Sequence, residues 1–375
     1  MKHDIKKIRE IAGEFPIYGD FISAAPYGSG HINDTYAVAF NQAGTSIRYI
    51  FQRINHDIFK NPPALMENIK RVTSHQAAKL ADHTDSSRRT LTVVDTRDGQ
   101  PFYLDSEGNY WRAYPMIEGA QSHDILETPT QAFNAAKAFG GFQKLLVDMP
   151  GGRLHETIPY FHDTPKRLEA LKEAIAKDSA NRAALAKPEI DFVMEREAMA
   201  SKLLGLHAEG KIPERVTHND TKLNNVLIDE VTNEGLCVID LDTVMPGLAL
   251  YDFGDMVRTG TSPAAEDERD LSKVRARMEM FTALLEGYLA EASDFLNDTE
   301  KELLPFSGML ITFEIGIRFL TDFLSGDVYF KTSRPEHNLD RCRTQFKLVE
   351  SLESQEEALN RALSTALEKA AAGEL

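Results

Sequence analysis

Cysteine is scarce in this sequence, because the 375-residue chain contains only Cys237 and Cys342. Their separation matches no metal-ligand spacing, and two cysteines can form at most one disulfide. Each is expected to be a small buried apolar side chain. The composition therefore excludes a disulfide-stabilised scaffold and predicts a reducing, cytoplasmic location.

Positive charge is also deficient, with 42 Lys and Arg against 58 Asp and Glu, which gives a formal net charge of -16. Proteins that bind nucleic acid hold the phosphate backbone with clustered Lys and Arg. This balance argues against a nucleic-acid partner. A neutral small molecule, or an anion shielded by a metal ion, is the expected ligand.

Long apolar runs are missing as well. The most apolar stretch, residues 308–320, is interrupted by Glu314 and Arg318, and it falls well short of the roughly 20 residues that a membrane span needs. The charged, periodic first 15 residues lack the apolar run of a signal peptide and predict a helix. No membrane segment is expected.

The distribution of strand and helix signals predicts two lobes. Residues 1–118 contain β-branched and aromatic runs separated by Gly-rich turns, with one helix starting near Pro62. From residue 119 to residue 375 the signals are mainly helical, apart from a β-rich segment at 215–247. We predict an α+β fold with a small antiparallel sheet lobe followed by a larger helical lobe.

The β-rich segment contains the clearest chemical motif. His218, Asp220 and Asn225 follow the spacing H-x-D-x-x-x-x-N, which is that of a kinase catalytic loop. Phosphoryl transfer needs a carboxylate that orients and deprotonates the acceptor hydroxyl, and oxygen ligands for the metal ion. Asp220 suits the first role and Asn225 suits the second.

A second carboxylate follows on an apolar strand. Asp240 lies 20 residues after Asp220, so a hairpin between them would bring the two side chains together. Magnesium usually takes one or two carboxylates together with substrate phosphates. Asp240 is therefore the predicted metal ligand, and Asp242 is a second candidate if the strand continues.

The tripeptide Asp252-Phe253-Gly254 matches the metal-binding motif of protein kinases, but no apolar hairpin strand leads directly into it. We predict that Asp252 caps the following helix or accepts hydrogen bonds from the backbone of the catalytic loop.

These motifs resemble a known superfamily. The strings at 218–229 and 238–242, "HNDTKLNNVLID" and "VIDLD", are similar to aminoglycoside phosphotransferases and choline kinases. Together with "GSGHINDTY" and "FQRIN", they most resemble bacterial N-acetylhexosamine 1-kinases. The resemblance implies a protein-kinase-like fold, with residues 1–118 as the nucleotide-binding lobe and 119–375 as the catalytic and acceptor lobe.

The same resemblance implies ATP and Mg²⁺ as cofactors and the anomeric hydroxyl of N-acetylglucosamine or N-acetylgalactosamine as the acceptor. Choline, homoserine, methylthioribose or an aminoglycoside are alternative acceptors. A nucleotide-binding pseudokinase scaffold is an alternative of another class, although Asp220, Asn225 and Asp240 are all present.

The nucleotide side is predicted from the first strands. Gly28, Ser29 and Gly30 lie between two predicted strands, where glycine lets the backbone approach phosphate oxygens. The strand that follows has no Lys, so Arg53, paired with Glu67, is expected to supply the positive charge. Gln52 is the alternative, because adjacent strand residues face opposite sides.

The remaining site residues follow from the resemblance alone. The segment 114–119 resembles the hinge that binds adenine, with Pro115 and Ile117 as its contacts. The predicted acceptor contacts are His31, Asn33, Asp220, Arg318 and Tyr329, with Glu314 as a weaker candidate. Arg318 and Asp322 lie four residues apart in a predicted helix, so an ion pair between them is the alternative interpretation of Arg318. Trp111 is expected in the core.

Overall fold

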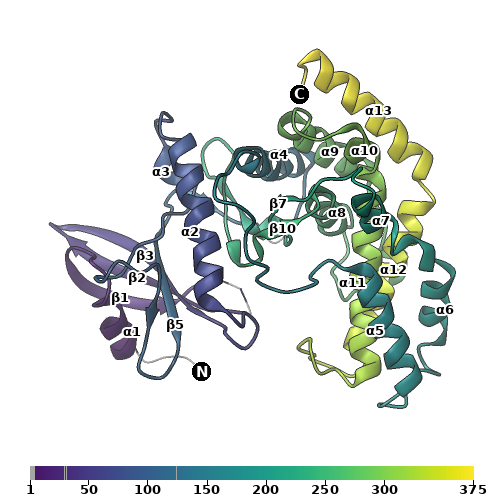
Figure 1. Cartoon of the computed structure of the whole chain (residues 1–375), viewed down its shortest axis with the longest axis horizontal. Helices are drawn as coiled ribbons and strands as arrows, with labels where there is room; N and C mark the ends of the chain where they lie inside the picture. The colour runs from purple at the N-terminus through teal and green to yellow at the C-terminus, as the bar shows by residue number, and fades with distance from the viewer. Residues whose placement is uncertain (1–4, 29, 31, 124) are drawn as a thin grey trace.

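The computed structural model describes residues 5–28, 30, 32–123 and 125–375, arranged in two lobes (Figure 1). Ser29 and His31 lie outside the described residues. The first lobe contains the helices α1 (Ile5–Ala12), α2 (Pro62–Lys79) and α3 (Ser86–Arg89) and the strands β1 (Asp20–Pro26), β2 (Asp34–Gln42), β3 (Thr45–Ile54), β4 (Tyr103–Leu104) and β5 (Tyr110–Pro115).

These five strands form one antiparallel sheet in the order β1-β2-β3-β5-β4. Its core face follows the period of two that strands impose, since Tyr36, Val38 and Phe40 of β2 are buried in alternation. Helix α1 buries Ile8 and Ile11 in the same apolar cluster. Trp111 is fully buried there and donates to Asp105 Oδ2 over 3.0 Å, which confirms its predicted core position.

The second lobe is mainly helical and occupies the right-hand side of Figure 1. Its helices are α4 (Pro129–Leu146), α5 (Thr164–Lys177), α6 (Lys187–Glu195), α7 (Lys202–Ala208), α8 (Ala249–Gly260), α9 (Met278–Ala292), α10 (Asp298–Glu302), α11 (Leu304–Ser325), α12 (His337–Glu353) and α13 (Glu356–Ala372). Its short strands are β6 (Ala120–Gln121), β7 (Arg215–Thr217), β8 (Val226–Asp229), β9 (Gly235–Val238) and β10 (Met245–Gly247). The predicted α+β fold with a sheet lobe and a helical lobe is confirmed.

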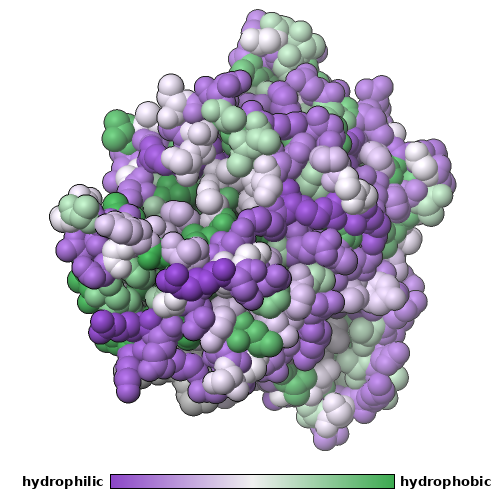
Figure 2. Space-filling view, turned by 60° about the vertical axis from the view of Figure 1, so that its left-hand side comes forward, coloured by the Kyte–Doolittle hydropathy of each residue, from purple (hydrophilic) through white to green (hydrophobic). Residues whose placement is uncertain are grey.

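Helix α11 forms the centre of this lobe, where it packs against α8, α12 and α5. It is long and apolar enough to cross a membrane by length and composition alone, but 83% of its most apolar window is buried inside the protein. A core helix accounts for that burial. On the surface, hydrophilic residues predominate over the face shown in Figure 2, with apolar residues in small scattered groups.

One segment departs from the helical expectation. Between α4 and α5, residues 147–163 contain no helix, because Pro150, Gly151 and Gly152 end the regular structure. The segment runs toward the sheet lobe, where the backbone N–H of His155 donates to Asn68 Oδ1 of α2 over 3.0 Å.

The lobe boundary at 118/119 remains our proposal. It fits the strand pairing, since β5 ends at Pro115 in the first sheet, whereas β6 starts at Ala120 and pairs with β8 of the second lobe.

Close contact between α4 and α9 gives a stability prediction. A Cβ added to Gly287 of α9 would lie 2.1 Å from the carbonyl oxygen of Phe133 on α4, which is backbone that cannot rotate away. We expect Gly287→Ala to lower the free energy of unfolding by about 1–3 kcal/mol or more through overpacking. The matched control is Gly205→Ala, since no atom lies within 4 Å of that added Cβ. Equal thermal unfolding midpoints for the two variants would contradict the prediction.

Candidate active site

A cavity of about 480 Å³ lies between the two lobes and brings the predicted catalytic residues together. Its lining comprises Gly30, Ile32, Asn33, Thr35, Gln52 and Phe59 from the first lobe and Asp220, Lys222, Asn224, Asn225, Asp240, Asp242 and Thr243 from the second. Gly28 adopts a left-handed φ of 78°, and no atom lies within 4 Å of an added Cβ there, so the backbone at Gly28 is not covered by other described residues.

The predicted catalytic loop, residues 218–225, follows β7 and holds Asp220 beside a cation. The Asp220 carboxylate lies 3.1 Å from Lys222 Nζ. Burial by itself would raise the pKa of Asp220, but Lys222 and His218 outweigh it and hold that pKa below its ordinary value. Asn225 donates its amide N–H to the Asp220 carbonyl over 2.8 Å, so its amide oxygen remains as a possible ligand.

Asp240 reaches the same cavity from the β8–β9 hairpin, in the way the strand pattern predicts. It sits just beyond β9 with a left-handed φ of 58°, a conformation that is uncommon for non-glycine residues but that Asp adopts more readily than most. Desolvation in the cleft, helped by the carboxylates of Asp242 and Asp220, raises the pKa of Asp240 to about 6. Asp240 is therefore the carboxylate for which an added cation would be most stabilising.

The strand does not continue to Asp242, because the chain turns into a short 3-10 helix at Leu241–Thr243. Asp242 is instead buried in an ion pair with Arg112 of β5, and its other oxygen accepts from Asn33 Nδ2 over 2.6 Å. Both contacts link the first lobe to the second. Each oxygen of Asp242 thus already has one partner, and a metal ion would have to use the remaining lone pairs.

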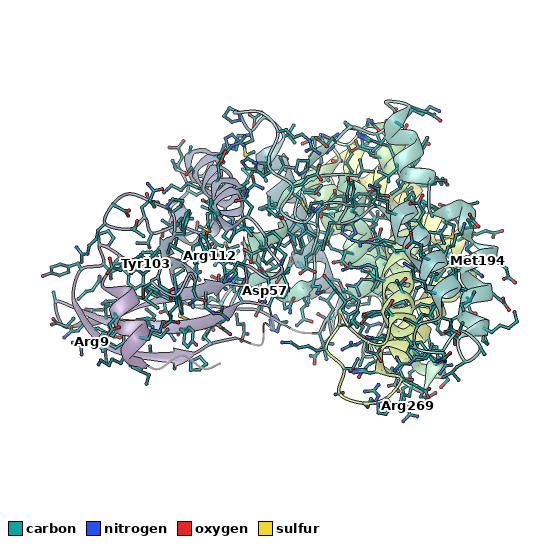
Figure 3. The ribbon with its side chains drawn as sticks, turned by 60° about the horizontal axis from the view of Figure 1, so that its bottom comes forward. Arg9, Asp57, Tyr103, Arg112, Met194 and Arg269 are labelled. Carbon is teal, nitrogen blue, oxygen red and sulfur yellow. The ribbon has the colours of Figure 1, made fainter. Side chains whose placement is uncertain are left out.

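Arg112 is a buried charged residue beside the cavity that sequence reasoning missed. It is 1% exposed and donates from Nε to Gln52 Oε1 over 2.9 Å, and Figure 3 labels it on the sheet lobe near the junction with the second lobe. Burial opposes its charge, but Asp242 outweighs that cost and the pKa of Arg112 is raised. A charged residue in a strand buried on both faces was the available signal.

The predicted pair of Arg53 and Glu67 is wrong. Arg53 forms an ion pair with Asp34 at 2.6 Å, and Glu67 contacts His155 at 3.0 Å. The register explains the error: neighbouring β3 residues face opposite sides, so Gln52 points into the cavity and Arg53 does not. Gln52 is directly opposite Arg112 on β5.

Asp252 hydrogen-bonds the catalytic loop, which confirms one of its two predicted roles. It lies within the first turn of α8 rather than at the cap and is fully buried. Its oxygens accept from the backbone N–H of His218 over 2.9 Å and of Asn219 over 2.7 Å, and from Gln143 over 2.6 Å. Burial raises the pKa of Asp252, and these donors oppose that shift.

The helix α11 carries the predicted acceptor residues outside this cavity. Glu314 is fully buried against His162 and Thr164 rather than facing a ligand. Arg318 lies over the ring of Phe161 at 5.4 Å. Asp322 accepts from the backbone N–H groups of the loop at 328–330. The alternative of an Arg318–Asp322 ion pair is not present.

Three predicted contacts are placed but not joined to the cavity lining. Pro115 ends β5 and Ile117 follows it, and neither lines the cavity. Tyr329 is 63% exposed, beside the ring of Phe330.

The anchoring role of Asp252 gives a prediction. In Asp252→Asn one amide hydrogen must face a backbone donor, so we expect a loss of about 1–3 kcal/mol in the free energy of unfolding, with divalent-cation binding unchanged. Urea unfolding and cation titration measure the two quantities. Asp191→Asn, on the exposed side of α6 where Asp191 pairs with Lys187, is the control. Unchanged stability with selective loss of cation binding would make Asp252 a metal ligand after all.

Comparison with known structures finds the same fold. A spectinomycin phosphotransferase, solved with ADP and spectinomycin, is 13% identical with a TM-score of 0.57, covering 100% of this chain and 99% of that one. A choline kinase from Cryptosporidium parvum is 13% identical with a TM-score of 0.57, covering 96% and 97%. An ethanolamine kinase from Plasmodium vivax is 16% identical with a TM-score of 0.53, covering 86% and 81%.

The expected kinase-like two-lobed fold is thus confirmed. The sequence itself matches the phosphotransferase enzyme family over residues 23–288, which is most of the chain and includes the cavity and the catalytic loop. The chain therefore belongs to the phosphotransferase enzyme family.

Proposed function

We propose that this phosphotransferase transfers the γ-phosphoryl group of ATP to the anomeric hydroxyl of an N-acetylhexosamine, with Mg²⁺ as the metal ion. The observation that carries the proposal is the meeting of Asp220, Asn225 and Asp240 in one cavity, under a loop that contains Gly30. This is the minimum set for phosphoryl transfer: a carboxylate for the acceptor hydroxyl, and oxygen ligands for a metal that neutralises phosphate charge.

In this proposal Asp220 is the catalytic residue. Its pKa lies below the ordinary value, so the carboxylate is ionised at neutral pH and accepts the hydrogen bond of the attacking hydroxyl. Such a weak base contributes chiefly by orienting the nucleophile. Lys222, 3.1 Å from Asp220, supplies compensating positive charge close to the reacting groups.

Asn225 and Asp240 would hold Mg²⁺. The described residues contain no cluster of three or more His, Cys, Asp or Glu side chains arranged for a metal ion. One carboxylate, from Asp240, and one amide oxygen, from Asn225, fit Mg²⁺, because this ion keeps several waters and binds through one or two carboxylates together with substrate phosphates. When bound, the ion would neutralise charge on the transferred phosphoryl group.

The nucleotide would lie against the first lobe. Arg112 lies behind the cavity-lining Gln52 and Asp242 and supplies positive charge to this wall without lining the cavity itself. Gly28, Ser29 and Gly30 remain the proposed phosphate-covering loop, and Pro115 and Ile117 remain the proposed adenine contacts.

The proposed acceptor wall comprises Arg318 and Tyr329, and the charges around it favour an uncharged acceptor. Arg318 forms no ion pair within the described residues and lies over the rings of Phe161 and Phe330. Arg167 is close enough that, after burial, repulsion from Arg318 is the next cause lowering its pKa. Two guanidiniums beside each other repel a cationic acceptor and can donate to the oxygens of a sugar or an amide.

The acidic side chains of α11 do not change this conclusion. The Glu314 carboxylate is hydrogen-bonded to His162 and Thr164, and the Asp322 carboxylate accepts from backbone N–H groups and Asn338. Arg318 and Tyr329, with Asn33 and His31, remain the proposed acceptor contacts. Choline and aminoglycosides, which are cations, become weaker alternatives than homoserine or methylthioribose.

Both cysteines are buried free thiols, and the cytoplasm is the proposed location.

The acceptor panel tests this proposal. ADP release is measured with ATP, magnesium and each of N-acetylglucosamine, N-acetylgalactosamine, choline, homoserine, methylthioribose and an aminoglycoside. We expect turnover with the N-acetylhexosamines. Turnover confined to a cation would contradict the sugar assignment and the argument from Arg318.

The control for the panel is Asp220→Asn. This variant should lose turnover by a factor of about 100 or more while keeping its fold and its affinity for ATP. Asp191→Asn should match the unsubstituted enzyme. Retained turnover in Asp220→Asn would contradict the assignment of the catalytic residue.

The raised pKa of Asp240 predicts a pH dependence. A metal ion needs the ionised carboxylate, so magnesium-dependent nucleotide binding should weaken as the pH falls below about 6, by about tenfold per pH unit. An unperturbed Asp would keep its charge down to about pH 4. Titrations of nucleotide with and without magnesium between pH 5 and pH 8 measure the difference. Magnesium-dependent affinity that stays constant to pH 5 would contradict the assignment of Asp240.

A further inference from the structure

His162 lies outside the cavity but contacts the catalytic loop. It is 7% exposed and belongs to the non-helical segment between α4 and α5. Its Nδ1 lies 2.8 Å from Glu314 Oε1, and its Nε2 lies 3.1 Å from the backbone carbonyl oxygen of Asn219. The other carboxylate oxygen of Glu314 accepts from Thr164 Oγ1 over 2.6 Å.

The partners of His162 determine its protonation state. A backbone carbonyl oxygen can only accept a hydrogen bond, and an ionised carboxylate can only accept as well. Both ring nitrogens must therefore donate, which requires the doubly protonated imidazolium. A neutral imidazole would leave one nitrogen lone pair facing an acceptor oxygen.

We propose that His162 is an imidazolium at neutral pH that, held by Glu314, positions the catalytic Asp220 by donating to the carbonyl oxygen of Asn219. His162 is a positioning residue in this role and does not touch the reacting groups. The inference rests on the proposed function, because it takes Asp220 as the catalytic residue.

The carbonyl of Asn219 is a sensitive point of control. It belongs to the same peptide unit as the backbone N–H of Asp220, so fixing this oxygen fixes the orientation of the chain at Asp220. Asn219 itself has a left-handed φ of 65°, a conformation that persists where surrounding contacts enforce it. The backbone N–H of Asn219 donates to Asp252 of α8, and the carbonyl oxygen of Asn219 contacts His162 in the segment between α4 and α5.

The same residues connect the catalytic loop to the proposed acceptor wall. Glu314 and Arg318 lie one turn apart on α11, and Phe161, which precedes His162, lies under the Arg318 guanidinium. Helix α11 thus carries both the partner of the positioning residue and a proposed acceptor contact. A displacement of this helix would reach Asp220 through His162.

The charged groups around His162 keep the imidazolium stable. Burial by itself would lower its pKa, but the Glu314 carboxylate outweighs burial, and Asp255 of α8 adds to the same effect, so the pKa of His162 is raised. The pKa of Glu314 is lowered in turn, chiefly by His162 against the effect of burial. Tyr251 of α8 packs its ring 5.0 Å from His162. The contribution of His162 is fully present below the ordinary histidine pKa of about 6.5 and is lost as the pH rises through the raised value, whereas the contribution of Glu314 is lost at acidic pH when its carboxylate is protonated.

The first experiment is ¹⁵N NMR of the histidine side chains in the full-length protein, with His162→Gln identifying the His162 signals among the 11 histidines. We expect both His162 nitrogens to be protonated at pH 7.5. A neutral His162 tautomer at that pH would overturn the proposal. This measurement does not depend on any acceptor, so it can succeed or fail independently of the proposed function.

The second experiment measures kcat and the KM for ATP of Glu314→Gln between pH 6 and pH 9. Removal of the carboxylate charge should lower kcat by about tenfold or more through misplacement of Asp220, with an additional loss as the pH rises and the KM for ATP unchanged. Unchanged kcat and an unchanged pH profile would overturn the positioning role even if His162 is an imidazolium.

Two further variants complete the test. If Glu314→Gln does not fold, Thr164→Val removes only the hydroxyl that donates to Glu314, and it should shift the same pH profile in the same direction. The matched control is His155→Gln, because His155 and Glu67 form a pair of the same kind on the exposed surface, away from the catalytic loop. Its profile should follow that of the unsubstituted enzyme. A shift in His155→Gln equal to that of the buried-pair variants would overturn the proposal.

Discussion

The three carboxylates that share one cavity are the constraint on which the site depends. Asp220, Asp240 and Asp242 all line it, and like charges held this close oppose one another's ionisation. Two of them have a cation beside them: Lys222 lies against Asp220, and Arg112 lies against Asp242. The third, Asp240, has no ion-pair partner among the described residues, and burial together with the other two carboxylates outweighs Arg112 and His218 and raises its pKa to about 6. The unpaired negative charge marks the position where an added cation brings the largest electrostatic gain.

The pairing of buried charges also explains how the two lobes are joined at the site. A buried ion pair contributes little net stability, because desolvation offsets the attraction, but breaking one side of it is costly. Arg112 comes from the sheet and Asp242 from the helical lobe, so the pair fixes the two lobes to each other at the cavity. Asn33 adds a second link to Asp242 from the first lobe. Geometry, rather than stability, is what this buried pair provides.

Residue type and spacing were enough to predict three residues that meet in the cavity. Asp220, Asn225 and Asp240 could be predicted because a loop motif and a hairpin are local in sequence, and Asp252 because no strand leads into it. Arg112 could not be found in this way. Its role depends on which strand lies next to β3 and on which face each residue points to, and β5 pairs with β3 across a separation of about 60 residues. A shift of one residue in register moves a side chain to the other face. This is why Arg53 was predicted to face the nucleotide, whereas Gln52 is the residue that lines the cavity.

The acceptor side shows why a global charge does not determine a local one. The chain carries a net charge of -16, but this total does not say which charge lies at a given pocket. Yet the acidic side chains of α11 are already committed: Glu314 to His162 and Asp322 to backbone amides. Arg318, between them on the same helix, pairs with aromatic rings instead. Because these buried acids hold the catalytic loop and the 328–330 loop, positive charge remains at the proposed acceptor contacts, and an oxygen-rich neutral molecule is the acceptor that we propose for them.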